Sequence, residues 1–531
     1  MINHPKNPTP SPSPLPLKGG EDKGEGVNFS PWIVGAFLGL MLFLMIGNQL
    51  HKPLAYDEFF NLSYGSRFLT QGPLAETDGQ RSPFLALNAL PCLPYGCELS
   101  ILKKSEMARL GVRLPTMILA LFLGIAIYRW TRELYGERPA LLSLVLYTLT
   151  PNFLAHGKQV TSDLAASLFY FLSIYFFWRL MKERRKRDFY FCALFTGVAI
   201  FSKYSGILLF FVLPFLWILE TRFRGLGKAA IKGVGFCLLV LLLINSFYLF
   251  QGSFEKASHY NWQSRSWQKL KAFDLPVPLP RIFALGLDYT SYLDENPHFG
   301  RPDNYILGKR HRKGRWYSFP LMVLLKTPIS FFLLLGLALS IKFSFSEKLK
   351  GSPFYLLIPF LLWLSYFSLF CDVQVGVRYV LPALSFLVVY AGKCLSQPPR
   401  PKIAGGTGLL LGWFIFSSLS YFPHQMSYFN EAIGPRINAY QFLADSNLDW
   451  ENKSYYVKKF IERYPDLGIT INEPLKPKSG FQIVSANEYV GILDEAGTSW
   501  IRKFKPLTHV TYSHYLFYIP PPELEGSLKG S

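Results

Sequence analysis

The feature that most constrains this chain is a series of apolar runs, each close to the length needed to cross a lipid bilayer. A spanning helix needs about 20 mostly apolar residues. Lipid-exposed backbone must also satisfy its own hydrogen bonds, which favours helices. The sequence therefore predicts an α-helical, polytopic membrane protein. Its eleven predicted spans cover residues 31–50, 109–129, 139–155, 163–179, 189–203, 205–220, 233–250, 317–341, 353–370, 378–393 and 403–421.

The basic residues lie mainly between these runs. The formal net charge is +20, from 55 Lys and Arg residues against 35 Asp and Glu residues. Such a charge is typical of nucleic-acid-binding proteins, but its position argues against that partner here. Loops rich in Lys and Arg stay on the cytoplasmic side of a membrane. The N-terminus is therefore predicted inside and the C-terminus outside. The loops that carry a large share of the cations cover residues 129–139, 179–187, 221–232, 342–350 and 393–402.

Three regions follow from this topology. Residues 1–30 are rich in Pro, Gly and Ser and predict a disordered cytoplasmic tail. Residues 31–421 form the membrane module, with long outer loops at 51–108 and 251–316. Residues 422–531 predict a small α/β domain on the outer side. Its expected elements are helices at 436–444 and 451–464 and strands at 481–485 and 510–519.

Two of the six cysteines, Cys92 and Cys97, share the first outer loop. An oxidising compartment permits a disulfide between them, and two free thiols are the equal alternative. No Cys/His cluster has the spacing of metal ligands. Asp445, Asn447 and Asp449 are interpreted first as turn residues, with binding of a cation or of sugar hydroxyls as the alternative.

Several ionisable residues gather where the apolar runs meet the outer face. Charged groups beside hydrocarbon are costly and usually functional. Each also has an ordinary structural explanation, because acids cap helix N-termini and long cations extend to the lipid headgroups. The residues are Asp57, Glu58, Asp163, Lys203, Lys326 and Arg378.

Acids and cations at this depth suit one kind of transfer chemistry. A sugar linked through phosphate to a membrane-embedded polyprenol could be transferred if a base takes the proton of an acceptor hydroxyl. Positive charge is then needed where the phosphate departs with a second negative charge. That phosphate is already a weak base, with a second pKa of about 6, so no general acid is required.

Segments along the chain resemble a known family in their order. They include Tyr56-Asp57-Glu58, Gly376-Val377-Arg378-Tyr379-Val380-Leu381-Pro382 in the pattern G-x-R-x-x-L-P, and residues 151–163, 197–206, 314–320, 325–328, 428–431 and 445–450. The set is similar to the polyprenyl-phosphate-sugar-dependent glycosyltransferases of the GT-C membrane fold. Within them it most resembles the bacterial relatives of protein O-mannosyltransferases (family 39). Aminoarabinose transferases of lipid A are more distant. The resemblance covers roughly residues 31–520.

The resemblance implies an inverting glycosyltransferase in the bacterial inner membrane, with its outer domain in the periplasm. It implies that Asp57 is the catalytic base and that Glu58 helps to place the acceptor. Lys203 and Arg378 would contact the carrier phosphate, with Asp163 and Lys326 in the wall of the site. No cofactor is required, and a divalent cation is left open. The donor would be a polyprenyl-phosphate sugar, and the acceptor a lipid, a glycan or a protein.

Two departures leave the acceptor open. Relatives often have H-P-P where this chain has Arg81-Ser82-Pro83, and protein mannosyltransferases usually have His at the position of Tyr379. Two other classes remain as alternatives: a transporter or flippase of lipid-linked sugars, and a non-catalytic membrane protein that binds glycolipid. The absence of an internal repeat argues against a transporter.

Overall fold

The computed structural model describes residues 31–72, 82–296, 303–341, 353–374, 376–396, 401–473, 475–492 and 495–521. The predicted tail at 1–30 and Arg81 lie outside these ranges, as do residues 342–350 of one basic loop. The helices of the membrane module are α1 (Pro31–Gln49), α2 (Tyr56–Gln71), α3 (Ala86–Ala89), α4 (Leu99–Lys104), α5 (Glu106–Tyr135), α6 (Glu137–Leu149), α7 (Pro151–His156), α8 (Asp163–Glu183), α9 (Lys186–Ser202), α10 (Leu209–Thr221), α11 (Leu226–Phe247), α12 (Arg265–Gln268), α13 (Arg281–Glu295), α14 (Ser318–Lys326), α15 (Ile329–Ser340), α16 (Phe354–Phe370), α17 (Leu381–Gly392) and α18 (Pro401–Leu419).

The chain is an integral, multi-pass membrane protein, and every predicted span falls on helix. Among the residues that the structure describes, six helical segments are long and apolar enough to cross a bilayer, or seven if the bent pair α14 and α15 counts as one span. The other four predicted spans coincide with α6 and α7, α9, α16 and α18, which do not meet the same test of length and composition. The count of eleven and the orientation therefore stay predictions.

The predicted single span at 317–341 is wrong as a continuous helix. α14 and α15 meet at an angle of 102°. Pro328 causes the break, because proline has no backbone N–H and disfavours helical geometry in the residue before it. The carbonyls released at the bend find new donors. Asn430 donates to the carbonyls of Leu324 and Thr327 at 2.6 and 2.8 Å, and Asn152 donates to that of Lys326 at 2.8 Å.

Helix α17 lies at the centre of the bundle. It packs against α5, α6, α8, α15 and α16, and all of its residues are buried. A helix that is apolar all round is expected at such a central position. Its N-terminal end is preceded by a short 3-10 turn, Val377–Val380, which carries the G-x-R motif. The motif arginine is thereby fixed at one end of a fully buried helix.

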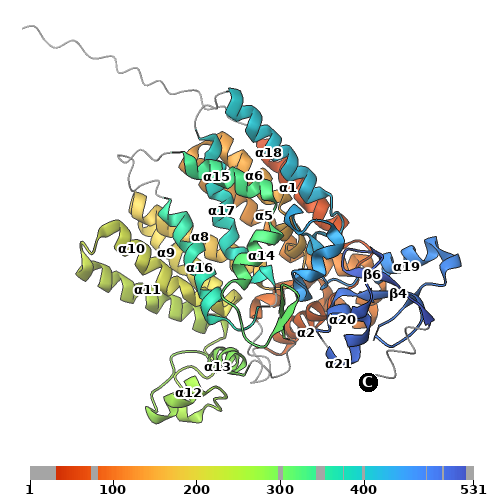
Figure 1. Ribbon diagram of the computed structural model, residues 1–531. Helices are drawn as coiled ribbons and strands as arrows, with labels where there is room; N and C mark the ends of the chain where they lie inside the picture. The colour runs from red at the N-terminus through yellow and green to blue at the C-terminus, as the bar shows by residue number, and fades with distance from the viewer. Residues whose placement is uncertain are drawn as a thin grey trace, which may run out of the picture.

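The C-terminal region combines short helices with a four-stranded mixed sheet, which confirms the small α/β unit. The strand order is β3-β4-β6-β5, with β3 and β4 parallel and the other pairs antiparallel. Its elements are α19 (Ser454–Arg463), β3 (Thr470–Ile471), β4 (Gly480–Ser485), α20 (Ala486–Val490), α21 (Glu495–Thr498), β5 (Thr508–His509) and β6 (His514–Ile519). The α-helix predicted at 436–444 is wrong, because Arg436–Gln441 forms a 3-10 helix. Figure 1 shows this region beside α2, at one end of the helical bundle.

A buried charge cluster joins the C-terminal region to the membrane module. Glu451 accepts hydrogen bonds from Lys52, at 2.7 Å, and from Lys158. The three side chains are at most 2% exposed. Burial alone would raise the pKa of Glu451, but Lys158 and Lys52 hold it well below the ordinary value. Because the two lysines come from the segments after α1 and α7, this cluster fixes one end of the bundle against the C-terminal region.

Two smaller features belong to the two long loops, at residues 51–108 and 251–316. Cys92 and Cys97 form a disulfide, which decides between the two alternatives for this pair. A hairpin of β1 (Asn304–Ile306) and β2 (Lys309–His311) lies in the second loop and was not predicted from the sequence. Within the described part of the chain, no group of His, Cys, Asp and Glu has the arrangement of a metal site.

Candidate active site

The acidic pair at the start of α2 divides into one accessible and one buried carboxylate. The side chain of Asp57 is 42% exposed, whereas that of Glu58 is 0% exposed. Successive residues of an α-helix point about 100° apart, so adjacent acids at a helix start can face different environments. Only Asp57 presents its carboxylate where a substrate can approach.

Glu58 is held by partners on every side. Its Oε1 accepts from Arg113 Nε at 2.9 Å and from the backbone N–H of Val160 at 3.0 Å. Its Oε2 accepts from Arg113 Nη2 at 2.6 Å and from the N–H of Ala55 at 2.8 Å. Burial raises the pKa of Glu58, but Arg113 and the two amides outweigh it and bring the pKa below the ordinary value. Glu58 therefore ties α2 to α5 and to the loop before α8.

Arg378 brings the motif at the start of α17 to Asp57. Its Nη1 lies 3.5 Å from Asp57 Oδ2, and its guanidinium lies over the ring of Trp450 at 4.4 Å. The side chain is only 15% exposed. Its Nε is buried and has no hydrogen-bond partner among the described residues. Buried donors of this kind usually have a partner, so this N–H group is available to bind an acceptor atom of a ligand.

Lys203 and Asp163 complete the group. Lys203 follows the last turn of α9 and donates to Asp163 Oδ1 at 2.5 Å, and Asp163 begins α8. Lys203 Nζ lies 4.5 Å from the centroid of Tyr379, and the guanidinium of Arg378 lies 5.7 Å from the same ring. The two cations predicted to bind phosphate therefore flank one aromatic side chain.

Lys326 is buried in a different environment. It ends α14 and is 1% exposed. Its Nζ donates to the carbonyls of Met426, at 2.8 Å, and Asn447, and lies 4.7 Å from the ring of Phe429. Three partners already surround the ammonium, so Lys326 holds the segments 426–429 and 447 beneath the site.

The C-terminal region supplies residues that the sequence did not identify as part of this group. Trp450 supports Arg378, and Asn447 Oδ1 accepts from the N–H of Val377 at 3.0 Å. Asp445 is also close enough to Arg378 and Asp57 to interact with both electrostatically. Burial raises the pKa of Asp445 to about 6, and Arg378 opposes that shift. The sequence signal for these residues is the stretch 445–449, which is rich in Asp and Asn and which is interpreted from the sequence first as a turn.

Part of the chain is similar to a known protein family. The family model for dolichyl-phosphate-mannose-protein mannosyltransferase matches residues 99–248, which include Asp163 and Lys203. Over these residues the chain is similar to that family. A comparison with curated protein sequences finds no match.

Solved structures of low sequence identity are similar to this chain over most of its length. The oligosaccharyltransferase of Archaeoglobus fulgidus, tethered with an acceptor peptide containing the NVT sequon, matches with a TM-score of 0.50 and 11% identity, over 93% of this chain and 75% of that one. ArnT from Cupriavidus metallidurans, bound to undecaprenyl phosphate, gives 0.49 and 16% identity, over 77% and 68%. AglB from Archaeoglobus fulgidus, with an inhibitory peptide and a dolichol-phosphate, gives 0.48 and 11% identity, over 82% and 60%. The first of these matches, with the TM-score of 0.50, shows that the bundle has a GT-C-like fold.

Proposed function

We propose that this protein is an inverting glycosyltransferase that moves a sugar from a polyprenyl-phosphate carrier to an acceptor hydroxyl on the outer face of the membrane. The observation that carries the proposal is the meeting of one accessible carboxylate, Asp57, with the guanidinium of Arg378 at 3.5 Å. A base and a phosphate-binding cation are the two groups that this reaction needs side by side.

The roles follow from the positions of the side chains. Asp57 takes the proton while the acceptor oxygen forms a bond to the anomeric carbon. The bond from that carbon to the phosphate oxygen breaks, and the electron pair leaves with the polyprenyl phosphate. Arg378 and Lys203 stabilise the second negative charge that appears there. Displacement from the opposite side inverts the anomeric centre, and no metal is needed for this balance of charge.

The remaining predicted residues act through these three. Asp163 pairs with Lys203 and orients its ammonium. Glu58 and Lys326 are proposed as positioning residues, because protein groups already surround their charged atoms. The acceptor can still be a lipid, a glycan or a protein.

The experiment that tests the proposal is the mass of the product. The purified full-length chain is incubated with a panel of polyprenyl-phosphate sugars and candidate acceptors bearing free hydroxyl groups. An acceptor heavier by one glycosyl residue, with release of polyprenyl phosphate, is the expected result. Movement of the lipid-linked sugar across vesicle membranes without any transfer would contradict the proposal and would favour a flippase.

Substitution Arg378→Lys tests the phosphate contact. Lysine keeps the charge but loses Nε and the planar fork that binds two phosphate oxygens. We expect donor binding to weaken by about ten- to a hundredfold, since an ionic hydrogen bond contributes about 1.5–3 kcal/mol. Binding of a fluorescent donor analogue measures this, with the exposed Arg463→Lys as the matched control. Unchanged affinity of the Arg378→Lys protein for the donor analogue would show that Arg378 does not bind the phosphate.

Asp445 is expected to make donor binding depend on pH. Its carboxyl group becomes neutral as the pH falls through about 6, and Arg378 then loses a compensating negative charge. The donor is a phosphodiester with a single charge over this range, so its affinity should rise several-fold between pH 7.5 and 5. In Asp445→Asn the rise should disappear. A rise of equal size in that variant would show that a group other than Asp445 causes the effect.

A further inference from the structure

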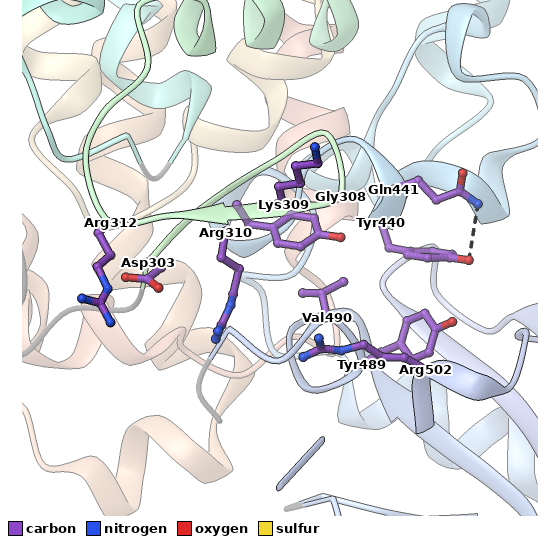
Figure 2. Close-up of a pocket in the computed structure, with 11 residues that line it drawn as sticks. Asp303, Gly308, Lys309, Arg310, Arg312, Tyr440, Gln441, Tyr489, Val490 and Arg502 are labelled. Carbon is purple, nitrogen blue, oxygen red and sulfur yellow. Dashed lines mark hydrogen bonds between the residues drawn. The ribbon is translucent and has the colours of Figure 1, made fainter. Parts of the chain in front are cut away.

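A cavity lies between the β1–β2 hairpin and the C-terminal region. Its volume is about 740 Å³. Figure 2 shows the side chains of the hairpin on one side and those of Tyr440, Tyr489 and Arg502 on the other. None of the residues assigned above to transfer lines it.

The walls are held in place by contacts between segments far apart in the chain. The N–H of Leu307 donates to the carbonyl of Phe442 at 2.7 Å. Arg310 Nη1 donates to the carbonyl of Gly491 at 2.8 Å. On the opposite wall, the rings of Tyr440 and Tyr489 pack edge to face with centroids 4.9 Å apart. The cavity is therefore a built feature and not a gap beside a loose hairpin.

The lining is strongly basic and partly aromatic. Of the described residues that line the cavity, four are cations and one, Asp303, carries a carboxylate. The cations are Lys309, Arg310, Arg312 and Arg502. Burial and then the cations Arg315 and Lys309 lower the pKa of the neighbouring His311, in keeping with a positive field at the hairpin. Arginine binds phosphate and carboxylate groups through its planar fork, and tyrosine offers a flat apolar face with a polar edge.

The cavity is also connected to the active site through short stretches of chain. On one side, Asn304 of β1 donates to the carbonyl of Asp372 at 2.9 Å and accepts from the N–H of Gln374 at 2.9 Å, four residues before Arg378. On the other side, Tyr440 lies five residues before Asp445, which faces Arg378. A long ligand could therefore extend from this cavity towards Asp57.

We propose that this cavity binds an anionic saccharide, a sugar chain that carries phosphate or carboxylate groups. The cations take its charged substituents, and the tyrosines contact the apolar faces of its rings. Its role as the binding site for the non-reacting part of the acceptor rests on the function proposed above. The binding itself does not depend on that function and is measured without donor.

The test uses the full chain in detergent and a fluorescent oligosaccharide with two phosphate monoesters. One cation is removed from each wall in the double variant Lys309→Ala/Arg502→Ala; both side chains are exposed, so folding is expected to be kept. The control, Arg463→Ala/Lys505→Ala, removes the same two residue types from exposed positions outside the cavity. We expect at least a tenfold loss of affinity in the cavity variant and less than a twofold change in the control. Equal losses of affinity in the cavity variant and the control would show that net charge alone weakens binding, and would contradict the proposed site.

Three further ligands test which chemical class of molecule the cavity binds. An oligogalacturonate of the same length should compete, because the cations accept carboxylates as well as phosphates. The dephosphorylated oligosaccharide should bind at least tenfold more weakly. Equally tight binding of that neutral chain, or of an acidic peptide of the same charge, would overturn the assignment to an anionic saccharide.

Binding of the probe should be unchanged in Asp57→Asn, in which transfer is lost. Loss of binding in that variant would show that the probe binds at the transfer site, and would contradict its assignment to this cavity. If no sugar donor supports transfer but the double variant still loses probe binding selectively, the proposed function fails and this inference stands.

Discussion

Replacement of Asp57 by Asn is expected to reduce transfer by about a thousandfold while donor binding is kept. A positioned general base contributes about 10²–10⁴ in rate, and asparagine has the same size but cannot accept the proton. Donor affinity should not fall and can rise, because Asp57 lies 3.5 Å from Arg378 and competes with phosphate for its charge. Product formation and binding of a donor analogue, measured on the same preparation, separate the two effects.

The matched control is Asp466→Asn, an exposed aspartate in the C-terminal region. It changes the net charge by the same amount and should leave both transfer and binding within twofold of the unsubstituted protein. Near-normal transfer by the Asp57→Asn protein would eliminate Asp57 as the base. A large loss of donor binding would show instead that Asp57 helps to hold the donor.

The positions of the helices could be predicted because each depends on a local property of the sequence. A long apolar run forms a helix in a membrane whatever its neighbours are, so α1, α5, α8 and α11 fall where hydropathy placed them. The bend after α14 depends on Pro328 and on donors from Asn152 and Asn430, which are distant in the sequence. Hydropathy cannot detect such partners.

The same distinction applies to the candidate site. Asp57, Asp163, Lys203 and Arg378 could be placed at one depth because each lies at the end of an apolar run. The contact between Arg378 and Trp450 crosses 72 residues and needs the C-terminal region to fold back over the bundle. Sequence position also gave no means of separating Asp57 from Glu58, since only the burial of Arg113 decides which acid turns inward.

Glu58→Gln is expected to destabilise the protein strongly while leaving the chemistry of each folded molecule nearly intact. The substitution leaves the guanidinium of Arg113 buried without a carboxylate partner. The amide NH₂ group of the new glutamine also faces N–H donors of Arg113 and Val160, from which it cannot accept a hydrogen bond. Removing one partner of a buried ion pair costs about 3–5 kcal/mol. Thermal unfolding in detergent measures the loss, and the exposed Glu462→Gln should change stability by less than about 0.5 kcal/mol.

Activity of the Glu58→Gln protein distinguishes a structural tie from a role in placing the acceptor. The contacts of Glu58 with Arg113, Ala55 and Val160 predict that transfer per folded molecule and the KM for acceptor stay within about threefold, after correction for the folded fraction. Glu58→Leu/Arg113→Met should recover part of the lost stability, because an apolar pair of similar volume replaces two buried charges. A contrary result would be a Glu58→Gln protein that is as stable as the unsubstituted chain but has a greatly raised KM for acceptor. It would show that Glu58 helps to place the acceptor and does not stabilise the fold.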